Sequence, residues 1–124
     1  MTNAVTWFEI GTDQPEAAER FYAELFGWTF GTEPGAAGDP AYRTTDTGVE
    51  GSIGGGIRDS GGAYPGYAIF YVQVADVADA CRRAEAAGGK VLVPAKSAAS
   101  GLTFAHLLDP TGNHIGVYAP PAGN

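Results

Sequence analysis

The sequence predicts an α+β fold in which two βαβββ modules form a half-open, concave mixed sheet with the helices on its outer face. The 124-residue chain matches itself without a gap at a shift of 62 residues, which places Phe8 on Phe70 and Gly27 on Gly89. In each half, strand-like alternation is followed by helical spacing and then by further strand segments. We therefore expect a single domain over residues 1–124, with repeats at about 5–57 and 67–118 and a linker at 58–66.

The first module opens with an alternating strand that leads into an amphipathic helix. Asp13, with Glu16 three residues later, has the pattern of a helix N-cap and capping box. Apolar residues then recur at helical spacing as far as Gly27, which is typical of a helix C-terminus. The strands expected in this module lie at 5–12, 28–30, 42–47 and 49–57, with a polar loop at 31–41.

The second module repeats this order. Asp76 is expected to cap a helix whose buried stripe runs from Val77 to Ala84 and includes Cys81. Gly88 follows the helix and favours its end. The strands expected here lie at 68–74, 90–93, 101–108 and 113–118, and the residues from Asp109 to Asn113 have a turn sequence.

Composition excludes several classes of function. Fourteen acidic residues against seven basic ones leave too little positive charge for a nucleic-acid partner. No apolar run approaches the ~20 residues needed to span a membrane, and the N-terminus lacks the pattern of a signal peptide. Cys81 is the single cysteine, so no internal disulfide can form. These features predict a cytoplasmic protein.

The faces of the first strand predict where a ligand binds. If Phe8 packs beneath the helix, Trp7 and Glu9 face the concave side; the opposite register would bury Glu9 under the helix without a cationic partner. The 62-residue shift then places Tyr71 on the same side. Alternation from the Asp109 turn adds residues of the last two strands. The expected ligand-binding residues are Trp7, Glu9, Tyr71, Phe104, His106, His114 and Tyr118.

The motifs resemble those of the vicinal oxygen chelate superfamily, which includes glyoxalase I, bleomycin-resistance proteins, fosfomycin-resistance enzymes and extradiol dioxygenases. The resemblance is carried by WFEI on the first strand, AAERFYAELFGW on the first helix and DPTGNHIGVY at the end. It covers essentially the whole chain, and its opening looks most like glyoxalase-like proteins of actinobacteria. The resemblance implies the fold, whereas functions on this fold vary widely. For a chain of this length it also implies a homodimer.

The resemblance further implies where metal-using members carry their ligands. Matched to this sequence, those positions are Trp7, Gly54, Ile69 and Gly116, none of which offers a ligating side chain. We therefore expect no metal and no other cofactor. A different metal site formed by His106, His114 and Glu9 remains an alternative on sequence alone. Otherwise His114, beside the turn, is exposed or hydrogen-bonds the loop, and His106 is a polar side chain at the cavity wall.

Three functions follow from these residues. The first is metal-independent binding of a hydrophobic or aromatic small molecule, as in bleomycin-resistance proteins that sequester a drug or natural product. The second is a metal-independent isomerase or cyclase of a natural-product pathway, in which Glu9 or a histidine moves protons. The third is a dimeric domain whose cavity is filled by its own side chains. Beside these three, a metal-dependent glyoxalase or dioxygenase is less favoured.

Overall fold

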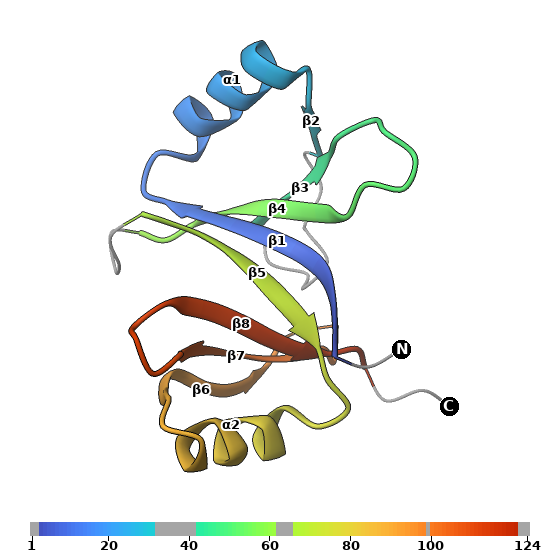
Figure 1. The fold of residues 1–124 in the computed structure, drawn as a ribbon. Coiled ribbons are helices and arrows are strands. Elements are labelled where there is room, and N and C mark those ends of the chain that lie inside the picture. Colours follow the sequence, from blue (N-terminus) through green and yellow to red (C-terminus); the bar gives the residue numbers. More distant parts are fainter. Residues whose placement is uncertain (1–2, 32–41, 62–65, 99, 122–124) are drawn as a thin grey trace. The chain divides into compact units, whose positions relative to one another are not determined.

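The computed structural model describes residues 3–31, 42–61, 66–98 and 100–121. These residues form eight strands and two helices in the order β1–α1–β2–β3–β4 and β5–α2–β6–β7–β8 (Figure 1). The α+β fold class with two βαβββ modules is thereby confirmed. The predicted loop at 31–41 lies almost wholly outside the described residues, as do residues 62–65 of the predicted linker.

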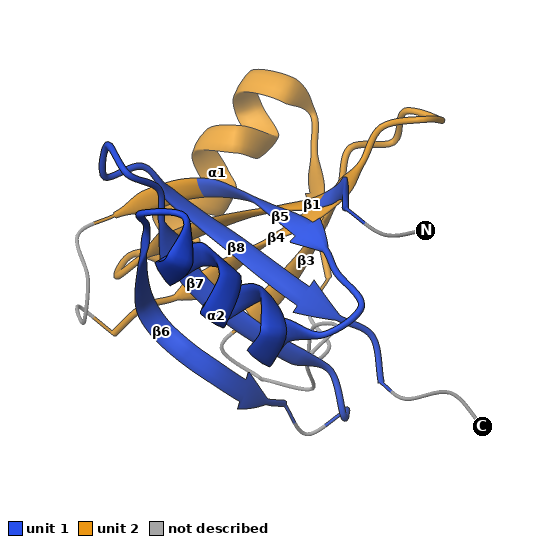
Figure 2. Cartoon of the chain, turned by 60° about the horizontal axis from the view of Figure 1, so that its bottom comes forward, with its two compact units in different colours: residues 1–6, 69–124 blue, residues 7–68 orange. Residues whose placement is uncertain are grey.

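The chain divides into two compact units (Figure 2). Unit 2 comprises Trp7–Ala68, and unit 1 comprises Met1–Thr6 together with Ile69–Asn124. The first strand, β1 (Ala4–Thr12), therefore contributes residues to both units, as does β5 (Tyr67–Gln73).

In unit 2 the strands are arranged in the order β2, β3, β4, β1. The first and last of the module's strands, β1 and β4 (Gly54–Asp59), pair in parallel, whereas β3 (Tyr42–Asp46) pairs antiparallel with β4 and with β2 (Thr29–Phe30). Helix α1 (Pro15–Phe26) contacts β2 and β4. Parallel pairing of β1 and β4 requires the long crossover that α1, β2 and β3 provide.

In unit 1 the order is β5, β8, β7, β6, again with one parallel pair, β5 with β8 (His114–Ala119). Helix α2 (Val77–Ala86) packs on β6 (Lys90–Ser97), β7 (Thr103–Leu108) and β8 (Figure 2). Asp76 caps this helix as predicted, since its Oδ1 accepts a hydrogen bond from the Asp79 amide at 3.0 Å. The core under the helix is formed by Val77, Ala105, Leu107 and Val117.

Two local predictions in unit 2 are wrong. Helix α1 starts at Pro15 after Gln14, without a side-chain cap, so Asp13 is not its N-cap; proline favours the first helical position, and it sets the start of the helix. Strand β4 begins at Gly54 rather than at residue 49 and continues through Asp59. The segment before it turns at Gly51, whose φ of 88° is left-handed and incompatible with a strand.

Strand pairing also refines the internal repeat. Glu9 pairs with Gly56 in unit 2, and Tyr71 pairs with Gly116 in unit 1. The first strands are thus related by the shift of 62 residues, but the last strands of the two modules are related by a shift of 60. The residue of the first module equivalent to Gly116 is therefore Gly56, not Gly54.

Candidate ligand-binding site

Trp7 is an aromatic side chain with a fixed orientation at the start of the unit 2 part of β1. Its indole Nε1 donates a hydrogen bond to the Tyr42 hydroxyl oxygen at 2.6 Å. Its ring lies over the paired strand, where a Cβ atom at Gly54 would come within 2.8 Å of it. The glycine therefore leaves room for the indole to lie on the backbone. Trp7 stays partly exposed in this position.

Glu9 is a buried carboxylate on the same face of β1 and is 3% exposed. The Tyr67 hydroxyl donates to its Oε2 at 2.6 Å, and Tyr42 also hydrogen-bonds this carboxylate. A buried charge is tolerated only when such partners replace its water. Glu9 is thus the end point of two series of hydrogen bonds. One runs from Trp7 through Tyr42, and the other runs from Arg58 through Tyr67.

Both tyrosines of this network act as donors because they stay protonated. Burial, followed by the charge of Glu9, raises the pKa of Tyr42 well above its ordinary range. The same two causes raise the pKa of Tyr67, and the nearby Arg58 opposes this only in part. Each hydroxyl can therefore give its proton to a hydrogen bond with Glu9 and accept another hydrogen bond at its oxygen.

Unit 1 contains a chain of three hydrogen-bonded side chains. The Tyr71 hydroxyl lies 2.7 Å from His106 Nε2, and His106 Nδ1 lies 2.7 Å from His114 Nε2. His106 is only 1% exposed, whereas His114 is partly exposed. Burial lowers the pKa of His114, which favours the neutral imidazole. One histidine then donates the hydrogen bond and the other accepts it. If His106 donates from Nδ1, its Nε2 accepts from the Tyr71 hydroxyl; if His106 accepts at Nδ1, its Nε2 donates to Tyr71.

Aromatic rings surround this chain. Tyr118 meets the Tyr71 ring edge-on at 6.1 Å between centroids, and Phe104 meets His106 in the same way at 6.2 Å. The Tyr118 hydroxyl hydrogen-bonds Thr6 at 2.6 Å and donates to Gln73 at 3.3 Å. The five predicted ligand-binding residues of unit 1 therefore form one connected group, and Trp7 and Glu9 are linked in unit 2 through Tyr42. A ligand-binding role for the seven residues stays a prediction.

The residues at the metal positions do not fit a metal ion. The Trp7 indole nitrogen is used by Tyr42 and carries a proton rather than a free lone pair. A Cβ atom at Gly116 would overlap the Tyr71 ring, and one at Gly56 would overlap the Tyr42 ring, so tyrosines occupy the space of the missing side chains. Within the described ranges, no three His, Cys, Asp or Glu residues are grouped closely enough to hold a metal ion.

Sequence reasoning missed Tyr42 and Tyr67, which hold Glu9. A signal for Tyr67 was present, because it lies four residues before Tyr71 on one strand and therefore on the same face. Tyr42 carries no such signal. Its place beside Glu9 follows from the pairing of β3 with β4, which brings together residues far apart in the chain.

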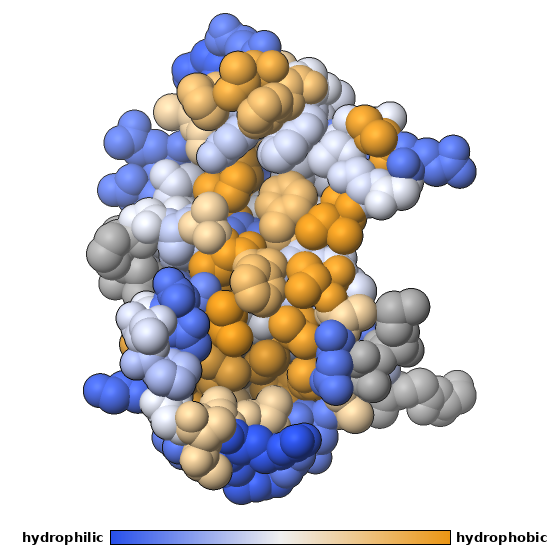
Figure 3. Space-filling view, viewed as in Figure 1, coloured by the Kyte–Doolittle hydropathy of each residue, from blue (hydrophilic) through white to orange (hydrophobic). Residues whose placement is uncertain are grey.

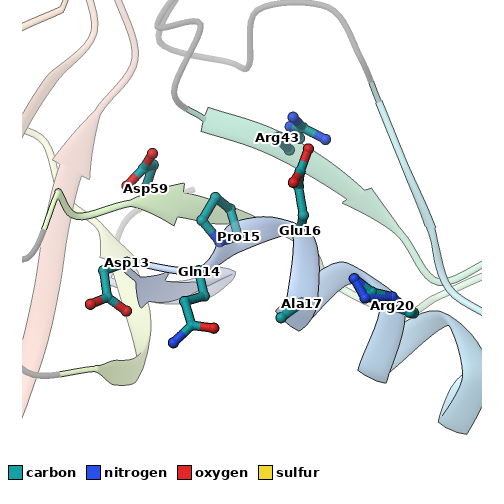
Figure 4. Close-up of a pocket in the computed structure, with 8 residues that line it drawn as sticks. All are labelled: Asp13, Gln14, Pro15, Glu16, Ala17, Arg20, Arg43 and Asp59. Atoms are coloured by element: carbon teal, nitrogen blue, oxygen red, sulfur yellow. The ribbon is translucent and has the colours of Figure 1, made fainter.

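A shallow, open pocket of about 590 Å³ lies at the start of α1 and is separate from the groups described above (Figure 4). Arg43, which lines it, is already paired with Glu19 at 2.8 Å. Both signs of charge line this pocket, and none of the predicted ligand-binding residues does. Its lining consists of Asp13, Gln14, Pro15, Glu16, Ala17, Arg20, Arg43 and Asp59.

The model of the Glyoxalase/Bleomycin resistance protein/Dioxygenase superfamily matches residues 4–117. The chain belongs to this superfamily. The resemblance seen in the sequence motifs is thereby confirmed. Curated relatives from Mycobacterium bovis and Mycobacterium tuberculosis, both named "Putative glyoxylase CFP32", are 32% identical over 119 residues, 96% of this chain. That match covers 45% of the relatives, so the chain spans about half of their length.

Solved structures with the same fold include methylmalonyl-CoA epimerases. The Mycobacterium tuberculosis enzyme has a TM-score of 0.61 at 16% identity, covering 98% of this chain and 90% of that one. A variant of the Streptomyces coelicolor enzyme, in complex with 2-nitronate-propionyl-CoA, has a TM-score of 0.64 at 15% identity, covering 98% and 97%. At these identities the likeness shows the fold alone. Across the described part of the chain, neither helix is long and apolar enough to cross a membrane.

Proposed function

We propose that this member of the superfamily binds a planar, hydrophobic or aromatic small molecule without a metal ion, in the manner of a drug- or natural-product-sequestering protein. The observation that carries this proposal is Trp7. It stands at a position where metal-using members carry a ligand, yet it presents a partly exposed ring fixed by Tyr42 and by the backbone at Gly54. A ring whose orientation is set before binding loses less entropy when a ligand stacks on it.

Glu9 acts in this proposal as an anchor. Its carboxylate is buried and accepts a hydrogen bond from Tyr67, so it fixes the hydroxyl of this partly exposed tyrosine, which belongs to unit 2 as Trp7 does. Aromatic contacts contribute about 0.5–1.5 kcal/mol per pair beyond burial of area. With one hydrogen bond and apolar burial added, micromolar affinity, about −8 kcal/mol, is within reach.

A second function is favoured by the Tyr71–His106–His114 chain. Hydrogen bonds of 2.7 Å connect a partly exposed imidazole to a buried phenol through a buried imidazole, which is an arrangement able to pass a proton. A metal-independent isomerase or cyclase would use such a relay, or Glu9, as acid or base. The fold is shared with methylmalonyl-CoA epimerases, whose name describes an isomerisation.

The experiment is a titration with a panel of planar aromatic antibiotics, followed by tryptophan fluorescence and by mass spectrometry of the recovered compound. Trp7→Ala should weaken binding at least tenfold, about 1.4 kcal/mol, with an unchanged circular dichroism spectrum. Trp28→Phe is the matched control, because Trp28 packs in the aromatic cluster of α1 and its loss should leave affinity unchanged. Prior dialysis against EDTA should also leave affinity unchanged.

The recovered compound separates the two functions. An unchanged compound, with Glu9→Gln altering affinity alone, supports sequestration. A chemically altered compound, with turnover abolished in Glu9→Gln or His106→Asn, would show that the chain is an enzyme and contradict the proposal. Affinity that EDTA abolishes would contradict its metal independence.

A further inference from the structure

Arg58 is a cationic residue on the face of unit 2 that carries Trp7 and Glu9. Glu9 pairs with Gly56 across β1 and β4, and Arg58 lies two residues further along β4. Residues two apart on a strand point to the same face, so Arg58 shares the face of Glu9. Its side chain is partly exposed and donates a hydrogen bond to the Tyr67 hydroxyl oxygen. A ligand on this face can therefore reach a positive charge.

The ring of Tyr67 covers the backbone of β1, as Trp7 and Tyr42 cover that of β4. A Cβ atom at Gly11 would overlap this ring. Gly11 is also the residue of β1 that pairs with Arg58, which explains why the Arg58 side chain reaches the Tyr67 hydroxyl. Aromatic rings and one guanidinium group thus lie on a single face within a single unit.

The protons of this hydrogen-bond network all point toward Glu9. Tyr42 accepts a hydrogen bond from the Trp7 indole and gives its own proton to Glu9. Tyr67 accepts from Arg58 and likewise donates to Glu9. A phenol and an indole each have one proton to donate, whereas a guanidinium has five N–H groups. Among these five side chains, Arg58 is therefore the one that can bind its network partner and also donate to a ligand.

Burial and charge indicate which ligand group Arg58 would bind. Glu9 is 3% exposed, so a ligand contacts the partly exposed guanidinium rather than the carboxylate. A ligand carboxylate can accept two parallel hydrogen bonds from a guanidinium, whereas an ammonium group would meet a like charge. Trp7 pairs with Gly54, four residues before Arg58 on β4, which is about 13 Å at a rise of about 3.3 Å per residue. This length suits a fused ring system with one acidic end.

We propose that unit 2 binds a planar aromatic acid, whose ring system stacks on Trp7 and whose carboxylate pairs with the Arg58 guanidinium. This inference rests on the proposed function: it names the class of ligand and adds Arg58 to the site. Tyr67 is a positioning residue in this arrangement, because its hydroxyl donates to Glu9 and accepts from Arg58. Glu9 thus orients the guanidinium through Tyr67 and does not itself touch the ligand.

The experiment compares compounds that share a ring system and differ in charge. The carboxylate, the carboxamide and the aminomethyl derivative of naphthalene, anthracene and pyrene are titrated into the full chain by calorimetry at pH 7.5. We expect a carboxylate to bind at least tenfold more tightly than its carboxamide, and the aminomethyl compound to bind more weakly still. Trp7-dependent binding in which the carboxamide or the amine equals the carboxylate would overturn this inference and leave the proposed function standing.

Arg58→Gln tests the residue itself. This variant loses the charge, keeps an N–H group able to donate to Tyr67, and should lower the affinity for the carboxylate at least tenfold while changing that for the carboxamide less than twofold. Equal losses for the two compounds would overturn the inference. Circular dichroism checks that the variant is folded, and the order of the three compounds on the wild type tests the inference without any variant.

Arg43→Gln is the matched control for charge. It removes one positive charge from the same unit, but Arg43 follows Tyr42 on β3 and therefore points to the opposite face, where it pairs with Glu19 at 2.8 Å. The affinity for the carboxylate should stay unchanged. A loss equal to that of Arg58→Gln would show that overall charge, and not a contact with Arg58, sets the preference, and would overturn the inference.

A second control concerns the apolar surface of α1. Hydrophobic side chains gather over this helix at the top of Figure 3, and Leu25 is 57% exposed, so an aromatic compound could also adsorb there. Leu25→Ser should leave every affinity unchanged. Binding that is lost in Leu25→Ser but kept in Trp7→Ala, or failure of every compound to bind the wild type, would contradict both the inference and the proposed function.

Discussion

The two units share one order of elements but differ in how their helix is covered. In unit 1, α2 buries Val77 against Ala105, Leu107 and Val117. In unit 2, α1 buries none of its residues, and its apolar side chains pack around Trp28 or face solvent. A repeated chain pattern therefore does not imply a repeated core, because each module closes its core with whatever side chains its own loops and strands bring together.

The second difference concerns the equivalent glycines Gly56 and Gly116. Both sit where a side chain would overlap a tyrosine ring, but the ring comes from β3 in unit 2, as Tyr42, and from β5 in unit 1, as Tyr71. The two modules thus fill the same space from different neighbours. The hydrogen-bond partner of the tyrosine also differs, since Tyr42 bonds the Glu9 carboxylate and Tyr71 bonds His106.

The largest expected effect contrasts the two apolar surfaces. Leu107→Ala, at a residue 5% exposed in the core of unit 1, should lower the free energy of unfolding by about 2–5 kcal/mol, because it leaves a cavity. Phe21→Ala, on the exposed face of α1, should change it by no more than about 0.5 kcal/mol. Urea titration of the wild type and of each variant measures both changes. Equal losses would mean that α1 is as well packed as the core of unit 1.

A smaller effect tests the glycines that accommodate tyrosine rings. Gly116→Ala and Gly56→Ala each add a methyl group where a ring lies and should destabilise the protein by about 1–3 kcal/mol. Gly31→Ala is the matched control, because a Cβ atom there has a single neighbour at 3.9 Å. Chemical denaturation again gives the values. If only one of the two glycines proved sensitive, the equivalence of their positions would fail.

The smallest effect is a dependence of stability on pH that comes from unit 1. Both histidines of the chain lie in unit 1, and burial lowers the pKa of His114 below its ordinary value of 6.5. Protonation then favours the unfolded chain, so the stabilisation is complete above pH 6.5 and is lost as the pH falls below it. His114→Asn should flatten this dependence when thermal unfolding is compared at pH 7.5 and 5.5. If the stability of this variant depended on pH as steeply as that of the wild type, a group other than His114 would cause the dependence.

The sequence determined the order of elements because local signals sufficed for it. The Asp76 cap, the end of α1 at Gly27 and the alternation of the strands each depend on a few adjacent residues. The same alternation placed Glu9 on the face opposite Phe8, and the structure agrees, since Phe8 packs on Trp28 and Glu9 bonds Tyr67. The family motif needed no more than these short segments.

Only the tertiary structure decided the register between strands and the partners of the buried polar groups. A slip of two residues leaves every side chain on the same face of a strand. Alternation could therefore not show whether Gly116 is equivalent to Gly54 or to Gly56. The strand pairing shows that it is Gly56. Tyr42 reaches Glu9 because β3 pairs with β4 across a long stretch of chain. The exposure of the apolar side chains of α1 also depends on which other elements pack against the helix, and the sequence of the helix alone does not contain this information.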